Sequence, residues 1–268
     1  MIVLGAGPAG EVLAGRVVEQ GRRTAIVESR LVGGECSFYA CMPSKALLRP
    51  AQALSEARRV PGAAQAVTGE LAVEPALARR EEISPDLDES GQASWLEERG
   101  ITLVRGHGRL DGERRVRVDD EPYEARDAVV LAVGSGASMP PISGLAESLP
   151  WTNREATTAR TLPASLIVLG GGVVGVEMAQ AYRTLGVEVT LLEAAPRLLA
   201  REEPFASEQV HAALRELGAD VRLGVSASAV RRDASGVTVE LGDSDRVQAQ
   251  EILGAVGWRP LTDDLGLE

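Results

Sequence analysis

The sequence predicts an α/β fold that contains two similar units, each built around a parallel sheet. The main observation is a pattern that occurs twice in the 268 residues: an apolar run, a glycine-rich turn, a helical stretch, and a second apolar run that ends in a glutamate. The distance from the first glycine to the glutamate is 23 residues in both copies, from Gly5 to Glu28 and from Gly170 to Glu193. An identical spacing indicates an internal repeat of one structural unit.

The first copy has the residue order of a Rossmann-type dinucleotide-binding unit. Ile2–Leu4 and Thr24–Val27 are predicted strands, and Glu11–Gln20 is the predicted helix between them. The turn Gly5–Gly10 reads GAGPAG, and its glycines allow a tight turn, close approach of a pyrophosphate and close packing of the helix. The pyrophosphate is expected at the helix N-terminus, where unpaired N–H groups favour an anion, and Glu28 is expected to accept hydrogen bonds from ribose hydroxyls.

The second copy repeats this order. Leu166–Leu169 is a predicted strand, Gly170–Gly175 reads GGGVVG, and a helix is expected to run to about Leu185. Val187–Leu192 then leads to Glu193. The sequence therefore predicts two nucleotide sites in one chain.

Further β-type runs and a long helical region complete the prediction. A closing strand of each parallel sheet is expected at 128–133 and at 251–256, and the remaining runs are expected to add sheet strands and a small β-meander in each half, at 101–104, 115–118, 221–223 and 237–241. One helix is expected at 46–59, and 94–99 is expected to be the end of another. The segment between them contains Pro75 and Pro85, which are expected to break helices. An irregular stretch from Met139 to Pro163 places the domain boundary, so the predicted domains are 1–149 and 150–268.

Composition excludes several classes of function. The net charge of −11 argues against a nucleic-acid partner, since proteins that bind phosphate backbones usually carry a basic face. No apolar run approaches the roughly 20 residues of a membrane span, and residues 1–5 do not read as a signal peptide, so a cytoplasmic protein is expected. Two cysteines and two distant histidines do not make a zinc site, and no metal site is predicted.

The only two cysteines lie in the stretch Gly33–Leu48, which reads GGECSFYACMPSKALL. In an ideal helix, residues five apart are about 7.5 Å apart along the axis. A disulfide requires Cα atoms about 5.5–6 Å apart. Cys36 and Cys41 can therefore bond only where the start of the helix is distorted, or if Cys36 lies in the preceding loop. Gly33 and Gly34 permit such an irregular entry.

The pattern GGxCxxxxCxPSK beside an N-terminal GxGxxG resembles class I pyridine nucleotide-disulfide oxidoreductases. This flavoprotein family includes dihydrolipoyl dehydrogenase, glutathione reductase and mercuric reductase. The resemblance continues through Trp151–Arg154, Gly170–Glu177 and Ala255–Gly257, so it covers essentially the whole chain.

The resemblance implies an activity and a role for four residues. FAD is expected in 1–149 and NAD in 150–268, and hydride is expected to pass from NAD(P)H through FAD to a Cys36–Cys41 disulfide and on to a small-molecule disulfide or metal-ion substrate. Cys41 resembles the flavin-proximal sulfur and Cys36 the interchange thiol that attacks the substrate. Lys45 resembles the lysine beside the flavin, and Glu177 resembles its partner. The sequence does not identify the electron acceptor.

The candidate cofactor-binding residues are spread over both halves. They are Gly5, Gly7, Pro8, Ala9, Gly10, Glu28, Gly34, Lys45, Gly108, Gly134 and Ser135 for FAD, and Gly170, Gly172, Val174, Gly175, Glu193, Val230 and Gly257 for NAD. The Glu193 carboxylate is expected to repel a 2′-phosphate, so NADP is less favoured, although Arg197 lies close enough in sequence to weaken that preference.

The sequence also departs from the family pattern. Family chains continue past the equivalent of residue 268 into a segment that completes the flavin site and into a dimerisation domain that supplies a histidine–glutamate pair, so a homodimer is implied for the family but its dimer domain lies outside these residues. His107 and His211 match no such motif and are expected at a strand edge and on a helix face. Trp258 stands where many relatives carry arginine beside the nicotinamide pocket, and Phe38-Tyr39-Ala40 differs from the common insert.

Three interpretations follow. The chain is expected to be a flavin-dependent disulfide oxidoreductase in a fragmentary or shortened form. The alternatives are a non-catalytic FAD- and NAD-binding module or redox sensor, and a flavin NADH oxidase or transhydrogenase without disulfide chemistry.

Overall fold

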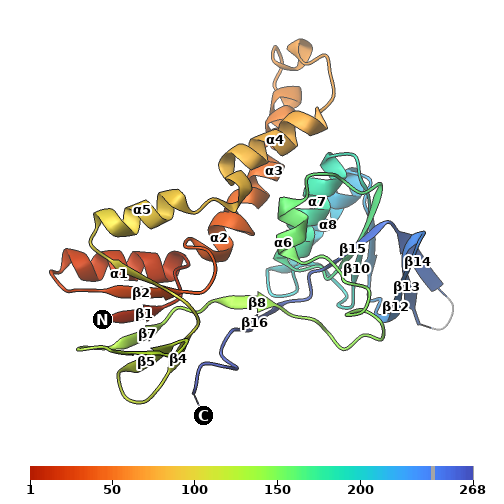
Figure 1. The fold of residues 1–268 in the computed structure, drawn as a ribbon. Coiled ribbons are helices and arrows are strands. Elements are labelled where there is room, and N and C mark those ends of the chain that lie inside the picture. Colours follow the sequence, from red (N-terminus) through yellow and green to blue (C-terminus); the bar gives the residue numbers. More distant parts are fainter. Residues whose placement is uncertain (243–244, 268) are drawn as a thin grey trace. The chain divides into compact units, whose positions relative to one another are not determined.

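The computed structural model describes residues 1–242 and 245–267, and it is an α/β protein with two compact units (Figure 1). Unit 1 comprises residues 1–42, 84–136 and 259–267, and unit 2 comprises the described residues of 43–83 and 137–258. The chain passes between the units within helix α3 (Cys41–Arg59), at the end of helix α4 (Val73–Ile83), within strand β8 (Ser135–Ala137) and within strand β16 (Trp258–Pro260).

Unit 1 is built on a four-stranded parallel sheet with the order β3-β2-β1-β7. Its elements are β1 (Ile2–Leu4), α1 (Pro8–Glu19), β2 (Ala25–Glu28), α2 (Gly34–Phe38), the 3₁₀ helix η2 (Pro85–Leu87), α5 (Ser90–Glu98), β3 (Thr102–Arg105), β4 (Gly108–Leu110), β5 (Arg115–Val118), β6 (Glu121–Glu124) and β7 (Val129–Leu131).

Unit 2 is built on a second parallel sheet with the order β11-β10-β9-β15. Its elements are the 3₁₀ helix η1 (Ala64–Ala66), α4 (Val73–Ile83), α6 (Asn153–Thr158), β9 (Ser165–Leu169), α7 (Val173–Thr184), β10 (Glu188–Glu193), α8 (Pro204–Glu216), β11 (Asp220–Leu223), β12 (Ala227–Asp233), β13 (Gly236–Leu241), β14 (Asp245–Ala249) and β15 (Glu251–Gly254).

The two sheets carry the same layers, which confirms the predicted fold class. In unit 1, Val3 and Ile26 pack with α1 and α5 on one face, and Leu4 and Val27 pack with the β4-β5-β6 meander on the other (Figure 1). Side chains of a strand alternate between its two faces, so an apolar run of this kind can be buried on both. The first strand of the repeat is therefore central in each sheet and buried on both faces.

In unit 2 the layering is repeated. Leu166 and Val168 of β9 pack with α7 and α8, whereas Ile167 and Leu169 pack with the β12-β13-β14 meander. The helical segment 43–83 joins the first of these clusters, because Leu47 and Leu48 of α3 and Ala76 of α4 are buried in it. This segment therefore folds as part of unit 2.

Two helix predictions need correction. Helix α3 begins at Cys41, five residues before the predicted start at Ala46. Pro75 does not break a helix, because it is the third residue of α4, and the first-turn N–H groups of a helix have no intrahelical partner to lose. Among the described helices, none combines the length and the apolar character that a membrane span requires.

Candidate active site

The glycine turn of unit 1 has a separate steric reason for each glycine. Gly5 has φ 101°, and a Cβ there would overlap the carbonyl oxygen of Ala132 at the end of β7. A Cβ on Gly10 would overlap the carbonyl oxygen of Gly5. A Cβ on Gly7, in contrast, would meet only the Cα of Gly34, at 4.0 Å. Gly5 and Gly10 therefore shape the turn, and Gly7 leaves room for a ligand beside the start of α1.

The glycine turn of unit 2 has the same three features. Gly170 has φ 104°, and a Cβ on it would overlap the carbonyl oxygen of Ala255. A Cβ on Gly175 would overlap the carbonyl oxygen of Gly170, whereas one on Gly172 would have no neighbour within 4 Å. The open space again lies at the second glycine of the GxGxxG pattern, here Gly172, directly before α7, where an anionic pyrophosphate is favoured.

Each glutamate at the end of the second strand is bonded to its own glycine turn. Glu28 Oε2 accepts a hydrogen bond from the Ala6 amide (2.8 Å), and its Oε1 accepts one from the Arg30 amide (2.8 Å). Glu193 repeats this arrangement: its Oε2 accepts from the Gly171 amide (2.5 Å), and its Oε1 accepts from the Ala195 amide (2.6 Å). An ionised carboxylate has about four acceptor positions, so each glutamate can still accept a ribose hydroxyl.

The carboxyl ends of the unit 2 strands surround a cavity of about 890 Å³. This volume lies within the range of about 300–1,000 Å³ that is usual for small-molecule sites. Five of the seven predicted NAD residues line it, namely Gly170, Gly172, Val174, Glu193 and Gly257. The cavity lies at the carboxyl ends of parallel strands, the edge at which open α/β sheets bind ligands.

The other two predicted NAD residues lie outside the lining. Gly175 packs behind Gly170, where it permits close approach of α7 to β9. Val230 is 2% exposed and belongs to the core under the meander, and its amide donates to the Ser143 carbonyl.

The lining also contains residues that the sequence reasoning missed. They include Ser138, Asn153 and the segments 199–202 and 225–227. Trp258, which the family resemblance placed beside the nicotinamide pocket, lines the cavity as well. Arg201 is the arginine among the lining residues. Arg197 donates to the carbonyls of Ala200 and Glu202 and so shapes the 199–202 loop. Positions directly after β10 and β11 carry a weak sequence signal, namely that they follow parallel strands.

The predicted FAD residues of unit 1 gather around the glycine turn. Pro8 and Ala9 are exposed in the first turn of α1, and a Cβ on Gly34 would lie 2.8 Å from the Gly7 Cα. A Cβ on Gly108 would lie 2.7 Å from Leu4 Cδ2, so this glycine lets β4 pack closely on β1.

The other two predicted FAD residues follow the closing strand of the sheet. Gly134 has φ 73° and follows β7, and Ser135 begins β8.

The two cysteines lie on either side of a break between two helices. Cys36 is half-buried within α2, and Cys41 is exposed as the first residue of α3. Tyr39, with φ −133° and ψ −3°, ends α2, and Gly33 at φ 108° precedes it. The distortion that a disulfide at this spacing requires is therefore present, with Cys36 inside a short helix rather than in a loop.

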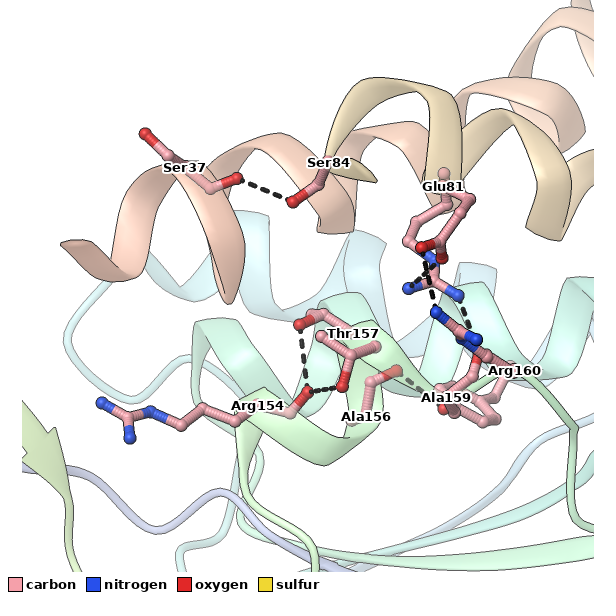
Figure 2. A network of polar contacts seen from close by, with 11 residues as sticks. Ser37, Glu81, Ser84, Arg154, Ala156, Thr157, Ala159 and Arg160 are labelled. Carbon is pink, nitrogen blue, oxygen red and sulfur yellow. Dashed lines mark hydrogen bonds and ion pairs between the residues drawn. The ribbon is translucent and has the colours of Figure 1, made fainter. Parts of the chain in front are cut away.

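Helix α2 is tied to the segment that follows α4. The hydroxyl of Ser84, a buried residue, donates to the carbonyl oxygen of Ser37 at 3.2 Å (Figure 2). Phe38 at the end of α2 is also buried. These contacts restrain the backbone next to Cys36.

Lys45 and Glu177 form an ion pair within unit 2. Lys45 Nζ lies 2.6 Å from Oε1 and 2.7 Å from Oε2 of Glu177. Lys45 follows Cys41 by four residues on α3, which is about one helical turn. It is also the single lysine of the sequence, since every other position in the Lys plus Arg total of 28 is arginine. Within these 268 residues, a lysine ammonium group therefore occurs at one place, four residues after Cys41.

The helical segment of unit 2 is held to α6 by a buried arginine. Arg80 of α4 is 3% exposed, and its guanidinium donates to the Ala159 carbonyl at 3.1 Å. The same guanidinium pairs with Glu81. Glu81 also pairs with Arg160 (Figure 2). Tyr182 of α7 donates to the Ala156 carbonyl at 2.7 Å. Helices α4, α6 and α7 are thereby fixed relative to one another within unit 2, and with them the helix that carries Glu177.

Known proteins are similar to this chain over all or nearly all of its length. The family model described as pyridine nucleotide-disulphide oxidoreductase matches residues 1–268. Dihydrolipoyl dehydrogenase of Thermus scotoductus is 32% identical over 275 residues, and mercuric reductase of Shigella flexneri is 34% identical over 279 residues. The chain spans 59% of the length of the first and 49% of the second.

A solved structure is similar in fold over nearly all of the chain. The HOCl-induced flavoprotein disulfide reductase RclA from Escherichia coli matches with a TM-score of 0.84 and 25% sequence identity. The match covers 98% of this chain and 57% of RclA. With its repeated glycine turns and its cysteine pair, the chain belongs to the pyridine nucleotide-disulphide oxidoreductase family.

Proposed function

We propose that the protein transfers two electrons from NAD(P)H through FAD to a Cys36–Cys41 disulfide, and from there to a small disulfide or a metal ion. The observation that carries this proposal is the presence of two complete dinucleotide turns, each with its own bonded glutamate, in a chain whose only cysteine pair spans a break between two helices. A protein that bound a nucleotide for structure alone would not need the second turn.

The residues present fit both cofactors. In unit 1, the space beside Gly7, the start of α1 and Glu28 are suited to the pyrophosphate and ribose of FAD. In unit 2, the cavity of about 890 Å³ offers the same arrangement to NAD(P)H through Gly172 and Glu193. Glu193 favours NAD, because its carboxylate would repel a 2′-phosphate, whereas Arg201 in the same lining would attract one.

Bound FAD supplies a two-electron relay between the pyridine nucleotide and sulfur. The chain's own part begins when the Cys36–Cys41 bond takes up the two electrons and breaks, which with one proton gives a Cys36 thiol and a Cys41 thiolate; the Cys36 proton later passes to the departing sulfur of the substrate. The Cys36 thiolate then attacks one sulfur of a substrate disulfide and releases the other as a thiol. Cys41 attacks the resulting mixed disulfide, which re-forms the Cys36–Cys41 bond and releases the second thiol.

Lys45 and Glu177 are proposed to act together beside this chemistry. A cation positioned next to a group that gains negative charge lowers the energy of the charged state, and the carboxylate holds that cation in place. The proton transfers at the two sulfurs also need a general acid or base. Neither histidine is proposed for this role, because His107 pairs with Asp264 on the surface of unit 1 and His211 lies on α8.

The substrate is proposed at the level of chemical class. The relatives are named dihydrolipoyl dehydrogenase, mercuric reductase and flavoprotein disulfide reductase, and thiol pairs react with small disulfides and with soft metal ions alike. The family resemblance further implies a homodimer, which the mass of the purified protein in solution tests.

Absorption spectroscopy on the purified protein tests the proposal. The protein is expected to hold FAD, and two-electron reduction is expected to give a long-wavelength charge-transfer band that Cys41→Ser removes. Cys36→Ser is the matched control, because it should keep the band but abolish disulfide reduction. A protein that holds no FAD when excess is supplied would support the non-catalytic module instead. Full turnover by Cys36→Ser would support an NADH oxidase or transhydrogenase.

A further inference from the structure

Trp258 lines the unit 2 cavity, and it has no stacking partner among the residues that the structure describes. It lines the cavity and is 42% exposed, in a sequence with only 3% aromatic residues. The other two tryptophans pack within the protein: Trp151 lies 6.1 Å from the Tyr182 ring, and the guanidinium of Arg99 lies 4.6 Å above the Trp95 ring. Among the described residues, Trp258 makes no ring contact of either kind.

The order of the strands indicates which half of a dinucleotide would meet Trp258. Glu193 ends β10 and is suited to the adenosine ribose, and Gly172 follows β9 and is suited to the pyrophosphate. The sheet order is β11-β10-β9-β15, so a ligand that runs from β10 across β9 continues to the end of β15. The segment 254–258 lies there and lines the cavity, with Trp258 as its largest side chain.

Charge is distributed unevenly over the same lining. Its ionisable side chains are Glu193, Arg201 and Glu202, and all three lie at the end of β10 or in the loop that follows it. In the described lining, the side near β15 is therefore without a formal charge, and Trp258 is the aromatic residue on that side. The oxidised nicotinamide ring is a flat cation, and an indole face is the aromatic surface that binds cations best.

We propose that Trp258 forms an aromatic wall for the nicotinamide half of the dinucleotide and stacks on its ring. This proposal rests on the proposed function in requiring that unit 2 binds NAD(P). It assigns Trp258 a positioning role: the indole fixes the plane of the nicotinamide, and so the face from which hydride leaves. Gly257, at φ 135°, supplies the backbone bend directly before it.

Binding of two ligands that differ only at the nicotinamide tests the proposal. Oxidised NAD and ADP-ribose are titrated into the purified protein by calorimetry, so that no turnover is needed. Trp258→Leu is expected to weaken binding of NAD by about fivefold to tenfold, from the usual strength of aromatic stacking and cation–π contacts. Binding of ADP-ribose is expected to be unchanged, which also shows that the variant is folded.

Two further variants sharpen the result. Trp258→Phe keeps an aromatic face and is expected to recover most of the lost affinity for NAD. Phe205→Leu removes a side chain that is 63% exposed on α8 and lies outside the cavity lining, so it is expected to change neither ligand.

The possible failures are distinguishable. If Trp258→Leu leaves NAD binding unchanged, or weakens ADP-ribose equally, Trp258 does not contact the nicotinamide, and the proposed function is unaffected. If the unmodified protein binds neither NAD nor NADP, the proposed function and the role of Trp258 are both overturned.

Discussion

Lys45 Nζ lies almost equally far from both carboxylate oxygens of Glu177, at 2.6 Å and 2.7 Å, and so joins α3 to α7. The lysine side chain is 61% exposed, and the glutamate side chain is 27% exposed. Exposed ion pairs of this kind typically contribute only about 0–1 kcal/mol to stability. The pair is therefore better explained by what it holds in position than by the stability that it adds.

Replacement of Lys45 should show whether the ion pair serves flavin reduction or the stability of the fold. Lys45→Met is expected to slow reduction of the bound flavin by NADH about a hundredfold, in the range known for the loss of one group that stabilises developing charge. Lys45→Arg is expected to recover little, because a planar guanidinium cannot occupy the place of a compact ammonium. Stopped-flow absorbance measures the rate. A fall of several degrees in the melting temperature of either variant would contradict the positional role.

The glycine turn of unit 2 offers a matched pair of alanine substitutions. Gly175→Ala places a Cβ against the Gly170 carbonyl, so we expect a loss of about 1–3 kcal/mol or more in the free energy of unfolding. Gly172→Ala places its Cβ in open space, and φ at this residue is −76°, so the fold should be unaffected while NAD binding weakens. Urea unfolding and NAD titration distinguish the two. Equal stability losses would be inconsistent with the assigned roles.

Tyr182 should make stability depend on alkaline pH. Burial raises the pKa of Tyr182 above its ordinary value of 10.0, and Glu251 adds to the rise while Arg80 opposes it. A pKa that is higher in the folded state contributes stability that is fully present below pH 10.0 and is lost as the pH rises beyond it.

The control for this dependence is Tyr182→Phe. It is expected to cost about 1 kcal/mol at neutral pH through loss of the hydrogen bond to the Ala156 carbonyl. The decline in stability above pH 10 or so should then become shallower than in the unmodified protein. Denaturant unfolding at a series of pH values measures both effects, and identical slopes for the two proteins would refute the assignment.

The stability that the N-terminal cap of α6 contributes should decrease in acid. Glu155 Oε2 accepts hydrogen bonds from the Thr152 amide and hydroxyl, both at 2.7 Å, and Thr152 Oγ1 accepts one from the Arg154 amide. Burial alone would raise the pKa of Glu155, but the hydrogen bonds from Thr152, together with the residue's own backbone amide and the charge of Arg154, outweigh it and lower the pKa. The stability that this capping box adds is therefore present above the ordinary pKa of 4.5 and lost as the pH falls.

Thr152→Ala is the variant that tests the capping box. We expect it to cost about 1 kcal/mol of unfolding free energy at neutral pH. Its cost should shrink in acid, where Glu155 is protonated in both proteins. A cost that stays constant from neutral to acid pH would show that the Glu155 carboxylate is not involved.

Much of the fold could be predicted from spacing. The equal distances from Gly5 to Glu28 and from Gly170 to Glu193 predicted two like units, and the sheets have the same strand order and the same layers. The spacing is informative because a turn that requires glycine at set positions leaves few alternatives. The Lys45–Glu177 pair was also predicted, although 132 residues separate the two, but only through resemblance to a family.

Other features could not be predicted from local pattern. The loops 199–202 and 225–227 line the cavity because they follow β10 and β11, not because of a residue type. Val230 resembles a site position in sequence but faces the core, since the meander turns it inward. Cys41 begins a helix in spite of Pro43, because a proline in the first turn removes no hydrogen bond that the helix would otherwise make.

The single lysine gives the protein an unusually simple amine chemistry. Reagents that modify primary amines can react with Lys45 and with the chain's amino terminus, and with no other ordinary side chain in these 268 residues. Isotope-labelled methyl groups attached to the Lys45 nitrogen would therefore give one side-chain resonance, from a residue that pairs with Glu177 and follows Cys41 by four positions. The shift of that resonance as the protein is reduced and reoxidised would report the state of the site directly, without interference from the many surface arginines.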